Sequence, residues 1–348
     1  MNLIAASLAA LLAASPAVVS HIDDDRIQES SGLAYSVKYP DLAYTVNDSK
    51  NRMVVYAIQV STGKVVGTTD LESLDLKDPE SIAVDPRGRV WLGDLGDNHE
   101  DRDNVSIVAF DEPGPTSAPP VGLQRYPVRF PKDPVNVEAM MVYPANSQIF
   151  LISKKDDENR GQASLFVLPP VLQNGQPNVA TDLHRPMPQR VSDATFAPDG
   201  RHALVETHDS VDVLDVTTWQ SVGTFDGPGL PQGESMTVEP GGRSVLMGTE
   251  GKDSALVRLD LPDYALPAAQ PTAAAPTDQS TAAAEAPPAD ALTGPNVTPA
   301  KAAPVGLATM GPILGLVVIG AGIAILRVVQ RHRRLARRHR RIDQRDRA

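Results

Sequence analysis

The chain has 348 residues, with 43 acidic and 32 basic side chains and a formal charge of −11. It contains no cysteine, which excludes disulfides, thiolate metal sites and cysteine nucleophiles. The tail, residues 327–348, carries a charge of +8 and the rest of the chain −19, a polarity that is atypical of a cytosolic enzyme.

Residues 1–20 are predicted to be a secretory signal peptide. Leu3 to Ala14 is an apolar run, and two short segments that end at Ala17 and Ser20 offer small residues for cleavage. Because no basic residue precedes the apolar run, an uncleaved anchor remains the alternative. Either interpretation places the middle of the chain outside the cytoplasm.

Residues 21–266 repeat one sequence pattern: an acid, a short β-branched strand, a turn with Pro and Gly or Asn, and a second strand. The clear copies begin at Glu80, Glu138, Ser192 and Glu234, and a looser copy begins at Glu29. A strand–turn–strand pattern is typical of a hairpin, and recurrence at roughly 40–50 residues is typical of propeller blades.

Further strands are expected between the copies, which gives about four strands per repeat. They are 53–58, 65–69, 105–110, 124–130, 164–168, 211–216, 221–225 and 256–261. The fold class is therefore all-β, a β-propeller of five blades, with six irregular blades as the alternative. The last unit lacks an outer strand, and we expect residues 21–28 to supply it.

Three further segments follow the predicted propeller. Residues 267–304 are rich in Ala, Pro and Thr, which favours a disordered, extended stalk. Residues 305–326 are 22 uncharged residues, enough for one transmembrane helix. The arginine-rich tail, 327–348, then lies in the cytoplasm, where it contacts anionic lipid; we expect no nucleic-acid partner. The protein is thus predicted to be a single-pass cell-membrane protein whose head faces outward.

The repeat also predicts where functional side chains gather. In a propeller the innermost strands begin, and the second strands end, at one mouth of the central channel. We therefore expect a carboxylate-rich site there. The candidate metal ligands are Glu29, Asp48, Glu80, Asp97, Asn98, Glu138 and Glu234, and the candidate ligand-binding residues are Lys154, His208 and Glu250. Asp193 lies one position out of register and is expected to cap a turn or face solvent.

Carboxylates at close range must be neutralised by protons, by Lys154 or by a cation. Calcium is the expected cofactor because it takes six to eight oxygen ligands with loose geometry, whereas the lack of cysteine and scarcity of histidine disfavour zinc. The alternative is that these acids only accept hydrogen bonds from neighbouring blades.

Several of these motifs also carry a family resemblance: Glu29-Ser-Ser-Gly32, Asp78-Pro-Glu-Ser81, Gly93-Asp-Leu-Gly-Asp-Asn98 with Arg102, and Val137-Glu-Ala139 with Ser153-Lys154. Together they resemble secreted bacterial β-propellers of the WD40-like, YncE-like or "esterase-like activity of phytase" type. The resemblance covers roughly residues 28–261 and implies a propeller fold and a possible phosphoester or ester hydrolase.

Three functions remain open at this point. The first is a cell-surface module that binds a ligand or an envelope protein through the channel mouth, with Ca²⁺. The second is a tethered phosphoester or ester hydrolase, whose candidate catalytic residues are Glu80, Glu138 and Lys154 and in which a calcium-bound water attacks. The third is a purely structural envelope protein. Serine-hydrolase, P-loop and zinc-protease motifs are absent from the sequence.

Overall fold

The computed structural model describes residues 16–48, 52–132, 134–155, 161–208, 210–230 and 233–267, except for the side chain of Glu234. Within these ranges the chain forms 21 strands and two short 3₁₀ helices, η1 (Glu72–Leu74) and η2 (Asp263–Ala265). The described chain is therefore almost entirely β-structure, as predicted.

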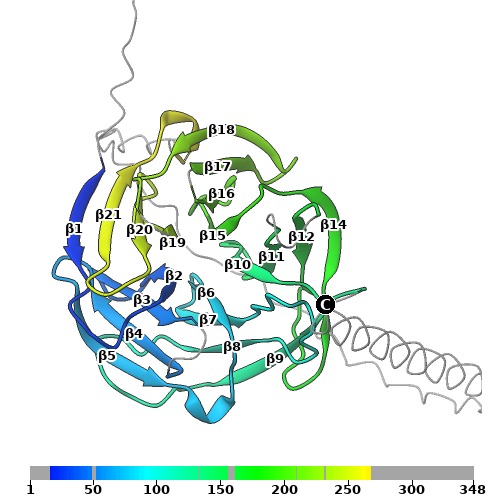
Figure 1. The fold of residues 1–348 in the computed structure, drawn as a ribbon, viewed down its shortest axis with the longest axis horizontal. Coiled ribbons are helices and arrows are strands. Elements are labelled where there is room, and N and C mark those ends of the chain that lie inside the picture. Colours follow the sequence, from blue (N-terminus) through cyan, green and yellow to red (C-terminus); the bar gives the residue numbers. More distant parts are fainter. Residues whose placement is uncertain are drawn as a thin grey trace, which may run out of the picture. The chain divides into compact units, whose positions relative to one another are not determined.

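The strands form five sheets, which follow one another along the chain (Figure 1). Blade 1 contains β2 (Ser30–Tyr35), β3 (Leu42–Asn47), β4 (Val54–Gln59) and β5 (Lys64–Asp70). Blade 2 contains β6 (Pro79–Val84), β7 (Arg89–Asp94), β8 (Ser106–Asp111), β9 (Gln124–Arg129) and β13 (Asn178–Val179). Blade 3 contains β10 (Val137–Val142), β11 (Ile149–Ser153), β12 (Ser164–Val167) and β14 (Thr181–Pro186).

Blade 4 contains β15 (Val191–Phe196), β16 (His202–Thr207), β17 (Ser210–Asp215) and β18 (Gln220–Asp226). Blade 5 contains β19 (Gly233–Val238), β20 (Ser244–Thr249), β21 (Ala255–Asp260) and β1 (Ala17–His21). The first strands of the blades, β2, β6, β10, β15 and β19, contact one another in a closed ring. The head is a five-bladed β-propeller, so the alternative of six blades is wrong.

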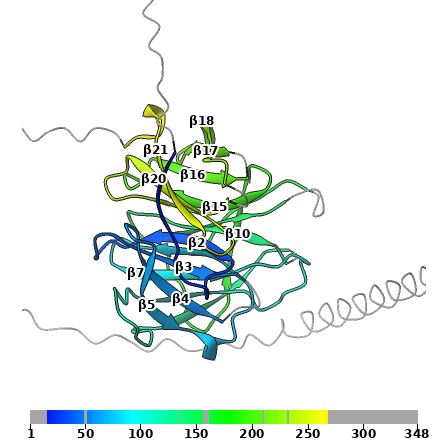
Figure 2. The same ribbon diagram turned by 60° about the vertical axis from the view of Figure 1, so that its left-hand side comes forward.

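The N-terminal strand β1 closes the ring. It pairs antiparallel with β21 as the outermost strand of blade 5 (Figures 1 and 2). The prediction that an N-terminal segment completes the last blade is confirmed, but the strand is Ala17–His21 rather than residues 21–28. Residues 17–20, which lie within the predicted signal peptide, are thus paired with blade 5 in this structure, and the signal peptide itself stays a prediction; residues 1–15 lie outside the described residues.

The segment after β1 is anchored to both neighbouring blades. The Ile22 N–H donates to the Ser254 carbonyl in blade 5 at 2.9 Å, and the Asp23 N–H donates to the Gly63 carbonyl in blade 1 at 3.1 Å. Ile22 and Ile27 are buried in the apolar cluster between these two blades. Residues 22–29 are thus a packed connection from the last blade to the first.

Two strands had no signal in the sequence. β14 carries Asp182, His184 and Pro186 and shows no alternation of apolar residues. β13 has two residues and pairs in parallel with β9 of the preceding blade. Both lie at outer edges, where burial places few demands on side chains.

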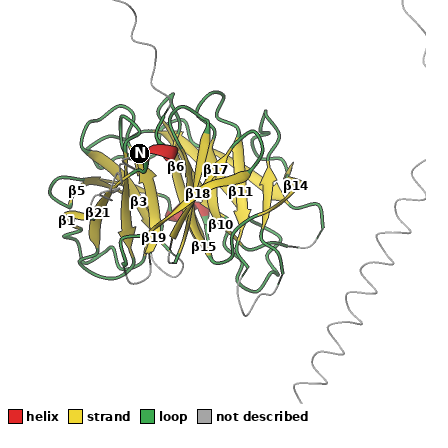
Figure 3. Cartoon of the chain, turned by 90° about the horizontal axis from the view of Figure 1, so that it is seen from above, coloured by secondary structure: helices red, strands yellow, loops and turns green. Residues whose placement is uncertain are grey.

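The core is divided among the five blade interfaces, each of which holds one apolar cluster. Between blades 3 and 4, for example, the ring of Phe150 packs against Phe196 at 5.5 Å and against Trp219 at 5.4 Å. Seen edge-on, the loops gather at the two ends of the strands (Figure 3). The two ends of the channel can therefore carry different residues on one scaffold.

The predicted stalk, transmembrane helix and basic tail lie outside the described residues. Within the part of the chain that the structure describes, no helix is long and apolar enough to cross a bilayer.

Candidate functional site

A β-bulge lies at the start of each innermost strand. In β6, Pro79 pairs with Asp94 and Ser81 pairs with Gly93, so Glu80 is the extra residue of the bulge. The same shift places Glu138 in the bulge of β10 and Ser192 in that of β15. Because a bulge re-aims its residue relative to the regular pleat, the repeat delivers these side chains to one end of the channel.

Three carboxylates converge at this mouth: Asp48 after β3, Asp78 before β6, and Glu80. One oxygen from each lies within 4.8 Å of the other two. Glu80 is 7% exposed. A Cβ on Gly96 would lie 2.5 Å from Asp78 Oδ2 and 2.6 Å from Glu80 Oε1. The lack of a side chain at position 96 therefore leaves room for the two carboxylates.

A fourth carboxylate, Glu138, adjoins this group and is 4% exposed. The Nζ of Lys154 lies 3.3 Å from Glu138 Oε2, and the Nδ2 of Asn136 donates to Glu138 Oε1 at 2.8 Å. Glu138 is thus held by one cation and one amide, and its charge is partly compensated.

The electrostatics of the cluster favour bound protons or a bound cation. Burial, together with the charge of Asp48, raises the pKa of Asp78 to about 7. Burial and the charge of Glu138 raise the pKa of Glu80 well above its ordinary value. Burial also raises the pKa of Glu138, although Lys154 opposes this. The fully ionised cluster is therefore unfavourable without a compensating positive charge.

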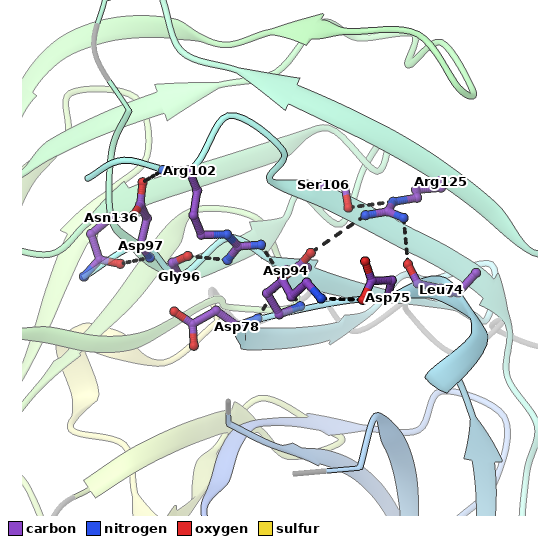
Figure 4. Close-up of polar contacts among 11 residues, drawn as sticks. Leu74, Asp75, Asp78, Asp94, Gly96, Asp97, Arg102, Ser106, Arg125 and Asn136 are labelled. Atoms are coloured by element: carbon purple, nitrogen blue, oxygen red, sulfur yellow. Dashed lines mark hydrogen bonds and ion pairs between the residues drawn. The ribbon is translucent and has the colours of Figure 1, made fainter. Parts of the chain in front are cut away.

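Asp94, at the end of β7, organises the loops around the cluster (Figure 4). Its Oδ1 accepts hydrogen bonds from the Lys77 N–H at 3.0 Å, the Asp78 N–H at 2.9 Å and Arg102 Nη2 at 2.7 Å. Arg102 also donates to the Gly96 carbonyl. Asp94 therefore positions the loop that carries Asp78 through these hydrogen bonds.

Asp97 and Asn98, both predicted metal ligands, have different surroundings. The Asp97 carboxylate accepts the N–H groups of Asp101 and Arg102, at 3.0 and 2.9 Å, and so braces the loop after β7. The exposed Asn98 accepts a hydrogen bond from Asn136 at 3.2 Å. These contacts favour a supporting role for both residues.

Glu29 is not in register with Glu80 and Glu138. The first pair at this end of blade 1 is Ser30 with Asn47, which corresponds to Pro79 with Asp94 in blade 2. Ser31 therefore occupies the position of Glu80, and its hydroxyl donates to the Glu80 carbonyl at 3.2 Å. The alignment from sequence is wrong by two residues because the turn between β2 and β3 is two residues longer than the turn between β6 and β7.

The remaining predicted residues divide into three cases. The raised pKa of Glu250 is caused by burial and by the charges of Asp48 and Glu29, which places it near the cluster. His208 follows β16 and is exposed. The side chain of Glu234 lies outside the described residues, although its backbone position in the bulge of β19 matches that of Glu80.

Asp193 is buried, at 2% exposed, and does not face solvent. Its Oδ2 accepts the Met236 N–H of blade 5 at 2.8 Å. In blade 2 the equivalent residue, Ser81, accepts the Met140 N–H of blade 3 at 3.0 Å. The expectation of a turn cap is thus wrong: this position joins adjacent innermost strands near the axis.

Asp78 lies within the carboxylate cluster, although it is not among the candidate metal ligands predicted from the sequence. The residue precedes its strand, and the strand register does not predict where the side chain of a loop residue points. The available signal was the neighbouring Asp94, an acceptor that lies opposite Pro79 and fixes the loop that carries Asp78.

The comparisons with known proteins show a similarity in fold only. No protein-family model matches the chain, and no curated protein matches it in sequence. Among solved structures, it is similar to the β-propeller domain of Myceliophteria thermophila Cps50 (Swd1), with 16% identity over 74% of this chain and 72% of that chain, at a TM-score of 0.39. It is also similar to a chain of a nidogen–laminin complex, with 15% identity over 59% of this chain and 66% of that chain, at a TM-score of 0.40.

Proposed function

We propose that the acidic mouth of the propeller binds a divalent cation, with calcium as the best fit, and that the head is a ligand- or partner-binding module of the cell surface. The observation that carries this proposal is the convergence of oxygens from Asp48, Asp78 and Glu80 within 4.8 Å of one another. Calcium binds oxygens at 2.3–2.6 Å, so oxygens on opposite sides of the ion lie about 5 Å apart.

Charge supports the same conclusion. Several acids lie at this mouth, and the pKa values of Asp78 and Glu80 are raised even though Lys154, which pairs with Glu138, lowers the pKa of Glu80. A divalent cation would compensate Asp48, Asp78 and Glu80 together. The loose geometry of calcium suits ligands that come from two blades.

The propeller fold is compatible with a protein-interaction module. For the location we rely on the sequence: a leader before β1, a 22-residue apolar segment at 305–326 and an arginine-rich tail. In this proposal the head lies outside the cell membrane and meets a ligand or an envelope protein there, while the tail contacts anionic lipid on the inside.

The test is a thermal melt of the full-length protein in detergent, with calcium or with a chelator. At a calcium concentration of 100 times Kd, binding adds about 2.7 kcal/mol of stability. For a domain of this size the midpoint rises by roughly 5–10 °C. An unchanged midpoint at millimolar calcium would contradict the cation site.

The variant Glu80→Gln sharpens this test. It removes a buried charge that is unfavourable without a cation, so it should raise the midpoint in chelator and remove the rise caused by calcium. The matched control is Glu72→Gln, since Glu72 pairs with Arg52 on the exposed surface. The control should keep the full calcium effect.

A tethered phosphoester or ester hydrolase is the second candidate. It is favoured by the 3.3 Å pair of Lys154 and Glu138 beside the proposed cation position, because a lysine there would bind an anionic substrate group. Calcium-dependent turnover of a generic phosphoester that is lost in Glu138→Gln would support it. No turnover across a broad panel, with calcium binding intact, would leave the binding module as the function.

A further inference from the structure

The opposite end of the channel is mainly apolar, and its residues recur at equivalent positions of the five blades. Two residues after each innermost strand stands an equivalent rim position, and all five positions line a cavity of 480 Å³. They are Val37, Pro86, Pro144, Pro198 and Pro240. Because proline has no N–H, this rim offers few hydrogen-bond donors.

The walls of this cavity are mostly apolar, although Ser36, Thr195, Thr237 and Glu239 also line it. Each innermost strand contributes one side chain from the same level of the channel, and each is at most 4% exposed: Leu33, Ile82, Met140, Ala194 and Met236. A cavity of 480 Å³ falls within the range of about 300–1,000 Å³ that is usual for ligand sites. Apolar surface of this extent is stabilised when an apolar group displaces water from it.

The chain itself returns to this rim. After β21, helix η2 carries the chain to Ala265, which is fully buried, and then to Pro267. A Cβ on Gly242 would lie 2.6 Å from Cγ of Pro267 and 3.3 Å from Cδ of Pro198. The last described residue of the head therefore lies beside a rim proline of blade 4 and next to Gly241, which lines the cavity.

The residues that follow have suitable chemistry. Residues 268–273 read Ala-Ala-Gln-Pro-Thr-Ala, and the first charge after Pro267 is Asp278. Six residues in a polyproline conformation reach about 19 Å, at about 3.1 Å per residue. A proline-containing segment loses less conformational entropy on binding, and its tether to Pro267 gives it a high effective concentration.

We propose that residues 268–273 bind across the proline rim and fill the apolar mouth of the channel, as a plug supplied by the chain itself. The observation that selects this occupant over a free apolar molecule is the position of Pro267 beside Gly242 and the rim residue Pro198. The proposal is independent of the cation site, which lies at the other end, and leaves residues 274–304 as the spacer.

The absence of cysteine allows a direct test in the full-length protein. Val37 lies on the rim in blade 1 and is 51% exposed, so Val37→Cys should be tolerated. Paired with Ala273→Cys, it should form an intramolecular disulfide about tenfold faster than the control pair Val222→Cys and Ala273→Cys, because the bound segment holds its cysteine near the rim. Val222 lies exposed on β18. Equal rates for the two pairs would overturn the proposal.

A second measurement uses the apolar dye anilinonaphthalene sulfonate and does not depend on cysteines. The double variant Ala269→Asp and Pro271→Asp places charges in the segment and should displace it, so dye binding should rise about tenfold over the unmodified protein. Strong dye binding by the unmodified protein that the double variant does not increase would overturn the proposal. In that case the cavity receives a separate apolar molecule.

Discussion

The two mouths of the channel are built from the same five hairpins, yet they differ in chemistry. At the acidic mouth the second residues of the innermost strands have diverged: they are Ser31, Glu80, Glu138 and Ser192 in four of the blades. At the apolar mouth the equivalent rim positions are four prolines and one valine. A repeat can therefore keep equivalent residues similar at one end of the channel while the residues at the other end differ from blade to blade.

The ion pairs near the two mouths also differ in how exposed their side chains are. Asp94 and its partner Arg102 at the acidic mouth have side chains 1% and 14% exposed, whereas Arg258, the partner of Glu239 near the apolar mouth, is 44% exposed. A charge that loses its partner is costly only where water cannot reach it. Substitutions that remove the acidic partner should therefore lower the free energy of unfolding more at the acidic mouth than at the apolar mouth.

The largest expected effect is that of Asp94→Ala. It removes the acceptor of two backbone N–H groups and of Arg102, and should lower the free energy of unfolding by about 3–5 kcal/mol. The counterpart Glu239→Ala should cost only about 1 kcal/mol, since Arg258 can turn to water. Urea unfolding of both variants measures the difference, and equal losses would contradict the contrast between the two ends.

A smaller effect is expected at Asp193, near the axis. Asp193→Ala leaves the buried Met236 N–H without its acceptor and should lower the free energy of unfolding by about 1–3 kcal/mol. Asp193→Ser, which introduces the residue that blade 2 uses at this position, should recover part of the loss. Denaturant unfolding of the two variants measures this difference. If Asp193→Ser is no more stable than Asp193→Ala, the proposed bridge between the innermost strands is unimportant for stability.

The acidic mouth should also give the protein an unusual pH dependence. The raised pKa values of Asp78, Glu80 and Glu138 mean that, between about pH 4 and 7, the folded state holds protons that the unfolded state has released. In chelator, stability should thus fall as pH rises through this window, by up to about 1.4 kcal/mol per pH unit for each proton. Saturating calcium should flatten the curve, and the apolar mouth should not contribute. Stability that instead rises across this window in chelator would refute the electrostatic account.

The smallest effect is expected at Glu29. Because Ser31 and not Glu29 shares the position of Glu80, Glu29→Gln should change stability and calcium affinity by no more than about 0.5 kcal/mol, or roughly twofold in Kd. Calcium titration beside Glu80→Gln provides the comparison. A loss as large as that of Glu80→Gln would restore Glu29 to the binding site.

The propeller could be predicted from sequence because the same pattern recurs in each blade, where the innermost strands must occupy equivalent positions. Acids, strands and turn prolines recur at Glu80, Glu138 and Glu234, and the pairing of those strands follows the predicted order. β14 could not be predicted, because an outer strand with Asp182 and Pro186 has no buried face to impose a pattern.

The candidate site was predicted less completely. Glu80 and Glu138 were found since strand register fixes their position, and Asp48 because it ends a second strand. Asp78 depends on hydrogen bonds from a loop to Asp94, and Asp97 is turned toward backbone N–H groups of its own loop. Such contacts depend on the path that each loop takes, and the alternation of side chains along a strand does not predict that path.

The closing strand has a consequence for biosynthesis. β1 is the first part of the propeller to leave the ribosome, but its partner β21 is among the last, more than 230 residues later. Until then β1 has an unpaired edge, and such long-range pairing makes folding slow. A chain with this design therefore closes its ring only if the edge of Ala17–His21 stays available until β21 has been made.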